Sequence, residues 1–376
     1  MKIEQAIKIK GKTFQFEQSR ISLKEPLVLI FGDRFMLEDV DVLSEVRSLY
    51  PDGHLVFGST SGEIIQSRVL DGTITLTAIE FENASFTVHK ENVKTFGYNE
   101  RKLGHSLRNK FPKKGLKYVF LVSDGSFVNG SSLIAGCTDE NETIGISGGL
   151  CGDGDRFQKT LSSYNEKPKE GEIVAIGFYG DSLEISSASY GGWSPFGPER
   201  TITKSKENIL YELDGKSALD LYKEYLGEKA KELPKSALLY PLNINVDDDG
   251  PSIVRTILNI DETSNAMVLA GDVPEGSKVQ LMMSTVDDIA EGASKAAHMA
   301  MKDRANKPEL AILVSCVGRK LVMGQRTEEE VEEVVSVIGE DVLVTGFYSY
   351  GEMAPFSGQG ACKLHNQTMT LTLISE

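Results

Sequence analysis

Residues 342–355 read VLVTGFYSYGEMAP, an apolar run followed by a loop in which glycines and tyrosines surround one carboxylate, Glu352. A second stretch of the same kind lies near the start of the chain. There, residues 55–64 read LVFGSTSGEI and place Glu63 directly after a glycine. A pattern that recurs so far along the chain indicates an internal repeat, in which each copy has the same order of elements.

The elements around the two stretches do follow one order. Each copy opens on an apolar strand, passes through an arginine turn and an amphipathic helix to the Gly-Glu loop, and closes on a strand that alternates threonine with aliphatic residues. The first copy comprises 27–31, Arg34, 55–64 and 73–79, and the last comprises 310–316, Arg319, 342–355 and 368–374. The alternation predicts strands buried on one face only. The helix of the last copy is predicted to begin at a capping box formed by Thr327 and Glu330.

A fainter copy lies between these two, in residues 118–124, 146–154 and 172–178, with Asp153 in the place of the glutamate. The repeats predict an α/β protein of two pseudo-symmetric halves, built from repeated strand-helix-strand units with mixed sheets. The loop GGWSPFGP at 191–198 contains glycines and prolines that exclude regular structure. We place the boundary just after it, which gives predicted domains of residues 1–215 and 216–376.

The charge of the chain argues against one class of partner. A balance of 40 basic and 55 acidic residues gives a net charge of −15, which disfavours non-specific binding to nucleic acid or to an anionic membrane.

No uncharged run reaches the ~18 residues of a membrane-spanning helix, and the N-terminal MKIEQAIKIKGK lacks the apolar core of a signal peptide. The 4 cysteines are far apart with no CxxC pair. We therefore expect free thiols and a cytoplasmic protein.

The repeat places charged side chains at one edge of the predicted sheets. Arg34 and Arg319 each follow a first strand, whereas Glu63 and Glu352 each follow a second strand. If the strands are parallel neighbours, each Arg and Glu share the rim where ligands bind in open α/β sheets. Two interpretations stay open: each pair forms an internal salt bridge, or the pairs face a cleft and hold a zwitterion such as an amino acid.

Further candidates for ligand contact lie in or beside the same loops. They are Ser59, Thr60, Cys151, Asp153, Tyr348, Tyr350, His365 and Asn366. No metal or cofactor is expected, because the chain has no HExxH motif, no Walker loop and no GxGxxG that opens a helix. No catalytic residue is predicted, since no GxSxG elbow or local nucleophile-base signature occurs. The alternative from another class is a hydrolytic type of enzyme that uses Cys151 or Glu352.

Several of these motifs together resemble one family. SCVGRK (315–320), GFYSYGEMAP (346–355) and HNQTMT (365–370) look like the C-terminal half of the FIST family, named for F-box and intracellular signal transduction proteins. FGSTSGEI (57–64) and ISGGLCGDG (146–154) resemble its N-terminal half. The resemblance implies a sensing module for small molecules such as amino acids, without an established catalytic activity. FIST regions are often fused to signalling domains, whereas here the two halves fill the chain. We therefore expect output through a separate signalling protein or through oligomerisation, with a scaffold that docks a signalling partner as a further alternative.

Overall fold

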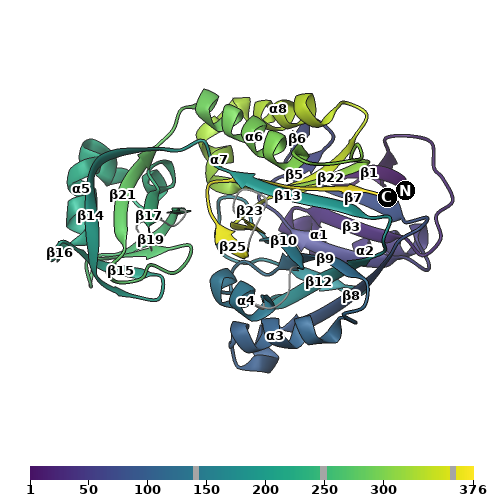
Figure 1. Cartoon of the computed structure of the whole chain (residues 1–376), viewed down its shortest axis with the longest axis horizontal. Coiled ribbons are helices and arrows are strands. Elements are labelled where there is room, and N and C mark those ends of the chain that lie inside the picture. The colour runs from purple at the N-terminus through teal and green to yellow at the C-terminus, as the bar shows by residue number, and fades with distance from the viewer. Residues whose placement is uncertain (139–143, 246–251, 356–360) are drawn as a thin grey trace.

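The computed structural model describes residues 1–138, 144–245, 252–355 and 361–376. It shows a larger body, where both termini lie, and a smaller lobe at the opposite end (Figure 1). The body has the predicted α/β character with mixed sheets. The chain divides roughly into two halves, and three repeated units are distributed between them.

The three units share one strand arrangement, in which a parallel pair is extended by two antiparallel strands. Unit 1 has the order β4-β3-β7-β1, unit 2 the order β10-β9-β12-β8, and unit 3 the order β23-β22-β26-β13. Their strands are β1 (Lys2–Ile9), β3 (Leu27–Gly32), β4 (His54–Ser59) and β7 (Thr73–Glu80); β8 (Ser85–Asn92), β9 (Leu116–Ser123), β10 (Gly145–Leu150) and β12 (Glu172–Tyr179); and β13 (Glu184–Tyr190), β22 (Leu310–Cys316), β23 (Leu343–Ser349) and β26 (Met369–Ser375). The faint middle copy of the sequence is therefore a complete unit.

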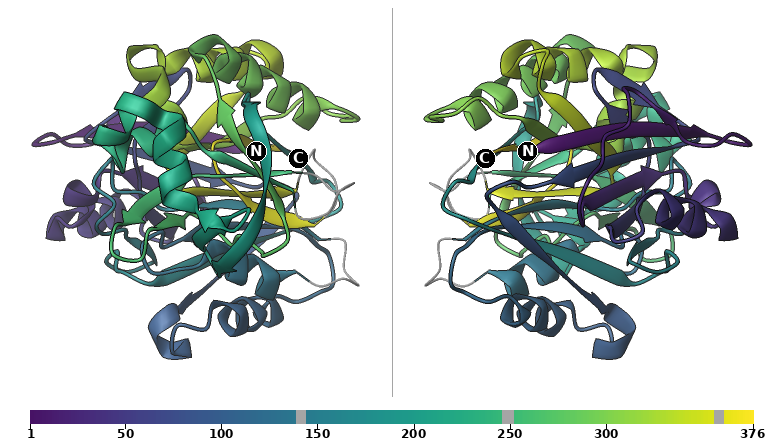
Figure 2. Two further views of the ribbon diagram at one scale, coloured as in Figure 1. Left: turned by 90° about the vertical axis from the view of Figure 1, so that its left-hand side faces the viewer. Right: turned by 90° about the vertical axis from the view of Figure 1, so that its right-hand side faces the viewer.

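Helices cover the outer face of each unit. They are α1 (Arg34–Leu37) and α2 (Val40–Leu49) in unit 1, α3 (Glu100–Lys110) and α4 (Gly130–Cys137) in unit 2, and α6 (Val286–Met301), α7 (Val317–Met323) and α8 (Glu328–Ile338) in unit 3, with the short helices η1 (Val93–Phe96) and η4 (Gly324–Arg326). Figure 2 shows the purple, blue and yellow-green helices on three different sides of the sheets. No helix in the described ranges combines the length and apolar character needed to cross a membrane.

Each unit also sends a strand to the edge of another unit. β5 (Glu63–Ile65) of unit 1 pairs with β23 of unit 3, and β24 (Gly351–Pro355) of unit 3 pairs with β10 of unit 2. β11 (Ser162–Tyr164) of unit 2 pairs with β4 of unit 1, which makes the exchange cyclic. The three units therefore have an approximate threefold relation. Three further strands, β2 (Gln15–Phe16), β6 (Arg68–Leu70) and β25 (Cys362–His365), extend β1, β5 and β24.

The inner faces of the three sheets enclose one core. It contains Leu29 and Phe31 of unit 1, Phe120 and Ile176 of unit 2, and Val314 and Phe347 of unit 3. The rings of Phe31 and Phe347, from different units, lie 4.6 Å apart. The outer faces pack on their own helices, as Ile74 and Leu76 do beside Val42 and Val46. Because each sheet is covered on both sides, the apolar runs seen in the sequence are continuous rather than alternating.

The threonine faces of β7 and β26 are buried as well. Thr75, Thr77, Thr370 and Thr372 are each no more than 1% exposed, so the prediction of strands buried on one face only is wrong. The reason is that these faces lie in the interior and not in solvent, and their hydroxyls find partners within their own unit or on a neighbouring sheet. Thr372 Oγ1, for example, lies 2.6 Å from Ser147 Oγ of unit 2. A hydrogen-bonded hydroxyl can be buried at little cost.

The smaller lobe is inserted between β13 and α6 of unit 3. Its strands are β14 (Ser194–Lys206), β15 (Ile209–Leu213), β16 (Lys216–Ser217), β17 (Leu242–Asn245), β18 (Ile253–Arg255), β19 (Ile257–Asp261), β20 (Ala266–Leu269) and β21 (Lys278–Met283), with the helices α5 (Ala218–Leu226), η2 (Gly227–Glu232) and η3 (Lys235–Leu239). The lobe has a core of its own, centred on residues such as Leu219, Tyr222 and Met267. The proposed boundary at residue 215 falls inside this lobe, between β15 and β16. The expectation that residues 191–198 lack regular structure is wrong from Ser194 on, because β14 begins there and pairs with β21.

A ring of backbone hydrogen bonds joins the three units where their parallel strands end. Ser61 N donates to Tyr348 O at 2.8 Å, and Tyr350 N donates to Leu150 O at 3.1 Å. Gly152 N closes the ring by donating to Ser59 O at 2.9 Å. We call residues 59–62, 150–153 and 348–351 the ring loops. Each loop is thus fixed by a different unit from its own.

Replacing Ser59 by alanine should weaken the whole fold. Ser59 Oγ donates to Gly152 O and accepts from Leu161 N, both at 2.8 Å, so Ser59→Ala leaves two buried backbone groups without partners. We expect a loss of about 1–3 kcal/mol in unfolding free energy, measured from urea denaturation curves. The matched control is Ser44→Ala, because that exposed hydroxyl bonds only within α2. Equal midpoints for the two variants would show that the hydrogen bonds of the Ser59 hydroxyl to Gly152 O and Leu161 N add no stability.

Candidate functional site

The predicted Gly-Glu loops place both glutamates in the interior. Thr60 Oγ1 donates to Glu63 Oε1 at 2.5 Å. Thr73 donates to Glu63 Oε2 through its hydroxyl at 2.6 Å and through its backbone N at 3.2 Å. The carboxyl group of Glu63 is therefore satisfied by neighbours within unit 1, and the residue is 1% exposed.

Glu352 is enclosed in the same way. Ser349 Oγ donates to its Oε1 at 2.6 Å, and Thr368 donates to its Oε2 through the hydroxyl at 3.0 Å and the backbone N at 3.2 Å. Both enclosures thus use a hydroxyl three residues before the glutamate and a threonine before or at the start of the last strand. These positions repeat in the sequence, so the holding residues could have been found from it.

Burial raises the pKa of Glu63 to about 7 and that of Glu352 to about 8, against the opposing effect of the hydroxyl and amide donors. The carboxyl group of Glu352 therefore retains its proton at neutral pH. A neutral, fully enclosed acid is a poor partner for the ammonium group of a ligand. The arrangement favours a structural role for both glutamates.

We call each place where one unit passes a strand to another unit a crossing. The third crossing, at which β11 of unit 2 pairs with β4 of unit 1, differs from the other two. In the first two crossings, Glu63 pairs with Phe347 and Glu352 pairs with Gly149. At the equivalent position of the third crossing, Ser162 pairs with Gly58. Asp153 therefore does not occupy the place of the glutamate, because residues 153–161 form an extra segment between the ring loop and β11. We call residues 153–161 the insertion.

Asp153 instead anchors the insertion to unit 1. Its Oδ1 accepts from Arg34 Nε at 2.9 Å and from Arg156 Nε at 2.8 Å, and its Oδ2 accepts from Lys159 N at 3.3 Å. Arg34 also forms a salt bridge with Glu38 through Nη1 at 3.2 Å. The predicted alternative of an Arg34–Glu63 salt bridge is therefore wrong.

Arg319 likewise pairs with a residue other than Glu352. It is fully buried and binds Glu330 Oε2 through Nε at 2.8 Å and through Nη2 at 2.7 Å. Glu330 reaches it because α8 lies over unit 3 and turns this side chain inward. The predicted capping box is wrong for the same reason: Glu330 points at Arg319, and the Thr327 hydroxyl donates to Gly324 O.

The remaining candidates near the ring loops also have internal partners. Tyr348 OH donates to Glu330 Oε1 at 2.6 Å. His365 Nε2 lies 3.0 Å from Ala354 O, and burial lowers the pKa of this histidine to about 4. Asn366 Nδ2 donates to Tyr350 O at 3.5 Å. These contacts bring the predicted residues together in the packed interior of the body and not in an open site.

Cys151 is fully buried, and burial raises the pKa of its thiol far above the ordinary value. Because the thiolate is the nucleophilic form, this environment disfavours covalent catalysis by Cys151. The 4 cysteines are all free and buried.

A cleft of about 570 Å³ opens between the body and the lobe. Its body wall is formed by the loop after β9, by the end of β10 and by the insertion, and its lobe wall by the β14–β15 turn, β19 and the end of β20. The lining residues are Glu100, 125–130, Leu150, Phe157, Gln158 and Tyr350 from the body, and Glu207, Asn208, Leu258, Asn259 and 269–271 from the lobe. Tyr350 is the predicted site residue that reaches this lining.

Aromatic side chains give the cleft fixed apolar surfaces. The rings of Phe157 and Tyr350 are stacked, with centroids 4.5 Å apart and planes 17° apart. Tyr350 OH accepts from Phe157 N at 3.0 Å and donates to Gly154 O at 3.3 Å, which fixes both rings. Phe127 is 41% exposed. Phe157 also has a φ of 52°, a conformation that costs energy in a non-glycine residue and often marks functional segments.

Direct bonds hold the lobe beside the cleft. Arg255 of β18 is 6% exposed and donates through Nη1 to Leu364 O of the body at 2.8 Å. Asn129 Nδ2 of the body donates to Asp272 Oδ1 of the lobe at 3.3 Å. Sequence reasoning missed the lobe side of the cleft, because nothing in the repeat points to residues of the insertion between β13 and α6.

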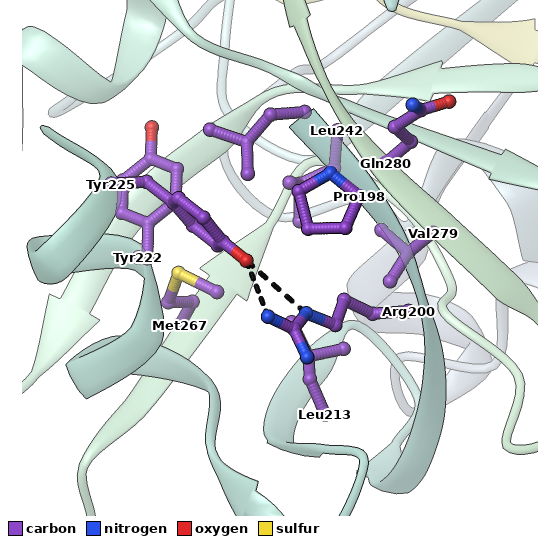
Figure 3. A pocket seen from close by; sticks show the side chains of 10 residues that line it. Pro198, Arg200, Leu213, Tyr222, Tyr225, Leu242, Met267, Val279 and Gln280 are labelled. Atoms are coloured by element: carbon purple, nitrogen blue, oxygen red, sulfur yellow. Dashed lines mark hydrogen bonds between the residues drawn. The ribbon is translucent and has the colours of Figure 1, made fainter. Parts of the chain in front are cut away.

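A second pocket, inside the lobe, is too small for a ligand. It has a volume of about 10 Å³, which is roughly the room of one water molecule. Figure 3 shows that its side chains converge, with Arg200 bonded to Tyr225 OH through Nε at 3.2 Å and Nη2 at 2.6 Å. We interpret this pocket as a packing gap in the lobe core.

Replacing Glu352 by glutamine should change how stability depends on pH. In the unfolded chain this carboxyl group ionises above about 4.5, whereas in the folded protein it keeps its proton up to about 8. Its contribution therefore falls as pH rises through that window, by a few kcal/mol in order of magnitude. Glutamine can donate to Ser349 and accept from Thr368 without titrating, so Glu352→Gln should remove this loss.

The measurement is the urea midpoint of both proteins between about pH 5 and about pH 8. Glu63→Gln is the companion variant, and its effect should end near pH 7. Parallel wild-type and Glu352→Gln curves across the window would contradict a protonated Glu352.

Removing the charge of Glu330 should be costly. Glu330→Gln leaves the buried guanidinium of Arg319 without its carboxylate, and we expect a loss of about 3–5 kcal/mol. Glu333→Gln is the control, because Glu333 is exposed on the same helix and should change stability by no more than ~0.5 kcal/mol. Thermal unfolding checks both, and a small effect of Glu330→Gln would contradict the buried pair.

Comparisons with known proteins agree with the resemblance seen in the motifs. The model of the FIST N domain matches residues 26–216, and that of the FIST C domain matches residues 218–355. The uncharacterized protein MJ1623 of Methanocaldococcus jannaschii is 25% identical over 351 residues, which are 83% of this chain and 66% of that protein. The chain thus spans slightly less than two thirds of this relative's length.

A crystal structure of a chorismatase aligns at 8% identity with a TM-score of 0.35, covering 100% of this chain and 98% of that one. A score this low supports no conclusion. FIST domains are associated with sensing in signal transduction. With both domain models matching across nearly the whole sequence, the chain belongs to the FIST family.

Proposed function

We propose that this protein is a sensing module of signal transduction that binds an amino acid or a similar small polar metabolite in the cleft between body and lobe. The observation that carries the proposal is the cleft itself, about 570 Å³ in volume and lined from both sides. Small-molecule sites are commonly concave, largely apolar, and placed between domains at the carboxyl ends of parallel strands. This cleft is concave and lies between body and lobe, beside the carboxyl ends of the parallel strands β9 and β10, and its lining combines aromatic with polar side chains.

The lining offers both parts that such a ligand needs. Phe127, Phe157 and Tyr350 supply aromatic surface, and Gln158, Asn208 and Asn259 supply amide groups. Among the predicted contacts the proposal retains Tyr350. The carboxyl groups of Glu63 and Glu352 are not available to a ligand, because neighbouring hydroxyls already donate to them.

The output of the sensor is proposed to pass to a separate signalling protein. A ligand that contacts both walls favours one position of the lobe over others, and a partner that reads that position would receive the signal. The proposal includes a cytoplasmic location, which is supported by the free cysteines.

A thermal-shift screen of amino acids and related metabolites with the full chain tests the proposal. A compound that raises the unfolding temperature should bind at least ~10-fold more weakly to Phe127→Ala, because that variant removes an exposed aromatic surface from the cleft. The control is Ile9→Ala: Ile9 is 45% exposed and lies at the end of β1, outside the lining. No hit across a broad library, or hits unaffected by Phe127→Ala, would contradict a sensor with its site in this cleft.

A further inference from the structure

The charged side chains that line the cleft are both acidic. They are Glu100, at the start of α3 in the body, and Glu207, in the turn between β14 and β15 of the lobe. No lysine or arginine is among the described lining residues. A ligand that enters therefore meets negative charge from two sides, and an anionic group would be repelled by both.

The two carboxylates belong to opposite walls. An approach of the two carboxylates would raise their mutual repulsion, which grows as the inverse of the distance between them. Glu207 lies in a turn and has a φ of 53°. Its backbone is fixed by a hydrogen bond from Val273 N to Glu207 O at 2.9 Å. The next residue, Asn208, is fixed by Nδ2 donation to Leu269 O at 2.8 Å. The acidic side chain is thus carried by a turn with a defined conformation.

The aromatic part of the lining accepts positive charge as well. The Nζ of Lys94, an exposed residue outside the lining, lies 6.0 Å from the centre of the Phe127 ring. Lys94 thus takes one approach to the Phe127 ring, whereas Phe157 and Tyr350 also present ring surface to the cleft. Ring faces attract organic cations more strongly when water is excluded, so aromatic surface and acidic groups together suit a small arylalkylamine.

We propose that the ligand of this cleft is a small organic cation with a flat apolar portion, an arylalkylamine, whose ammonium group is attracted by Glu100 and Glu207. This inference rests on the proposed function and narrows the ligand to compounds that carry an ammonium group. A free carboxylate on the same ligand finds no cationic side chain in the lining and weakens binding. The cation also offsets the repulsion between the two walls, so that binding draws lobe and body together.

Isothermal titration of the full chain with three compounds of one skeleton tests this inference. Tyramine carries only the amine, tyrosine adds a carboxylate, and 3-(4-hydroxyphenyl)propionate carries only the carboxylate. Tyramine should bind at least ~10-fold more tightly than tyrosine, with no measurable binding of the propionate. Glu207→Gln and Glu100→Gln should each weaken tyramine binding about 3- to 10-fold. Glu199→Gln, an exposed control in the lobe, should leave it unchanged.

The outcomes separate this inference from the function on which it rests. Equal or tighter binding of the propionate, or tyramine affinity unaffected by Glu207→Gln and Glu100→Gln, overturns the cationic class. If a screened compound binds through Phe127 while none of the three titrated compounds does, the class is also wrong and the sensor function stands. Failure of every compound in the screen overturns both.

Discussion

The ring of three backbone hydrogen bonds is the constraint on which the rest of this structure depends. Each unit ends its parallel pair at the ring and then passes a strand to another unit, so the sheets of the body are completed by their neighbours. The approach is close enough to require glycine. A Cβ on Gly152 would lie 2.8 Å from the backbone N of Ser61, and Gly62 has a φ of 142°, which side-chain-bearing residues rarely adopt. The glycines of the repeated motif therefore serve the crossing of units before they serve any ligand.

The approximate symmetry also explains where the cleft lies. Two crossings are closed by a glutamate whose carboxyl group is satisfied by neighbouring hydroxyls, so that this carboxyl group is not free for a ligand. At the third crossing, serine replaces glutamate and the insertion brings Phe157 against Tyr350. The lobe, itself inserted in unit 3, covers this side of the body through Arg255 and Asn129. Function is thus expected at the position where the repeat is broken.

Much of the body could be predicted from the sequence, because each apolar strand, arginine turn and Gly-Glu loop is a local pattern. The partners of the charged residues could not. Arg319 pairs with Glu330 because α8 packs over unit 3, and helical spacing alone cannot distinguish an inward glutamate from a capping one. The order of elements in the repeat predicts Asp153 at the glutamate position, whereas strand pairing gives that position to Ser162. The cleft combines residues about a hundred positions apart, such as Phe157 and Asn259, and no repeat relates them.

Hydrogen–deuterium exchange of the full chain, with and without saturating tyramine, tests most directly whether the cleft and not the ring is the place of binding. The account predicts slower exchange in the loop at 125–130 and in the turn at Glu207 and Asn208, with no change in the ring loops, whose amides already bond across units. Protection centred on the ring loops around Glu63 and Glu352, with none at the cleft, would contradict it.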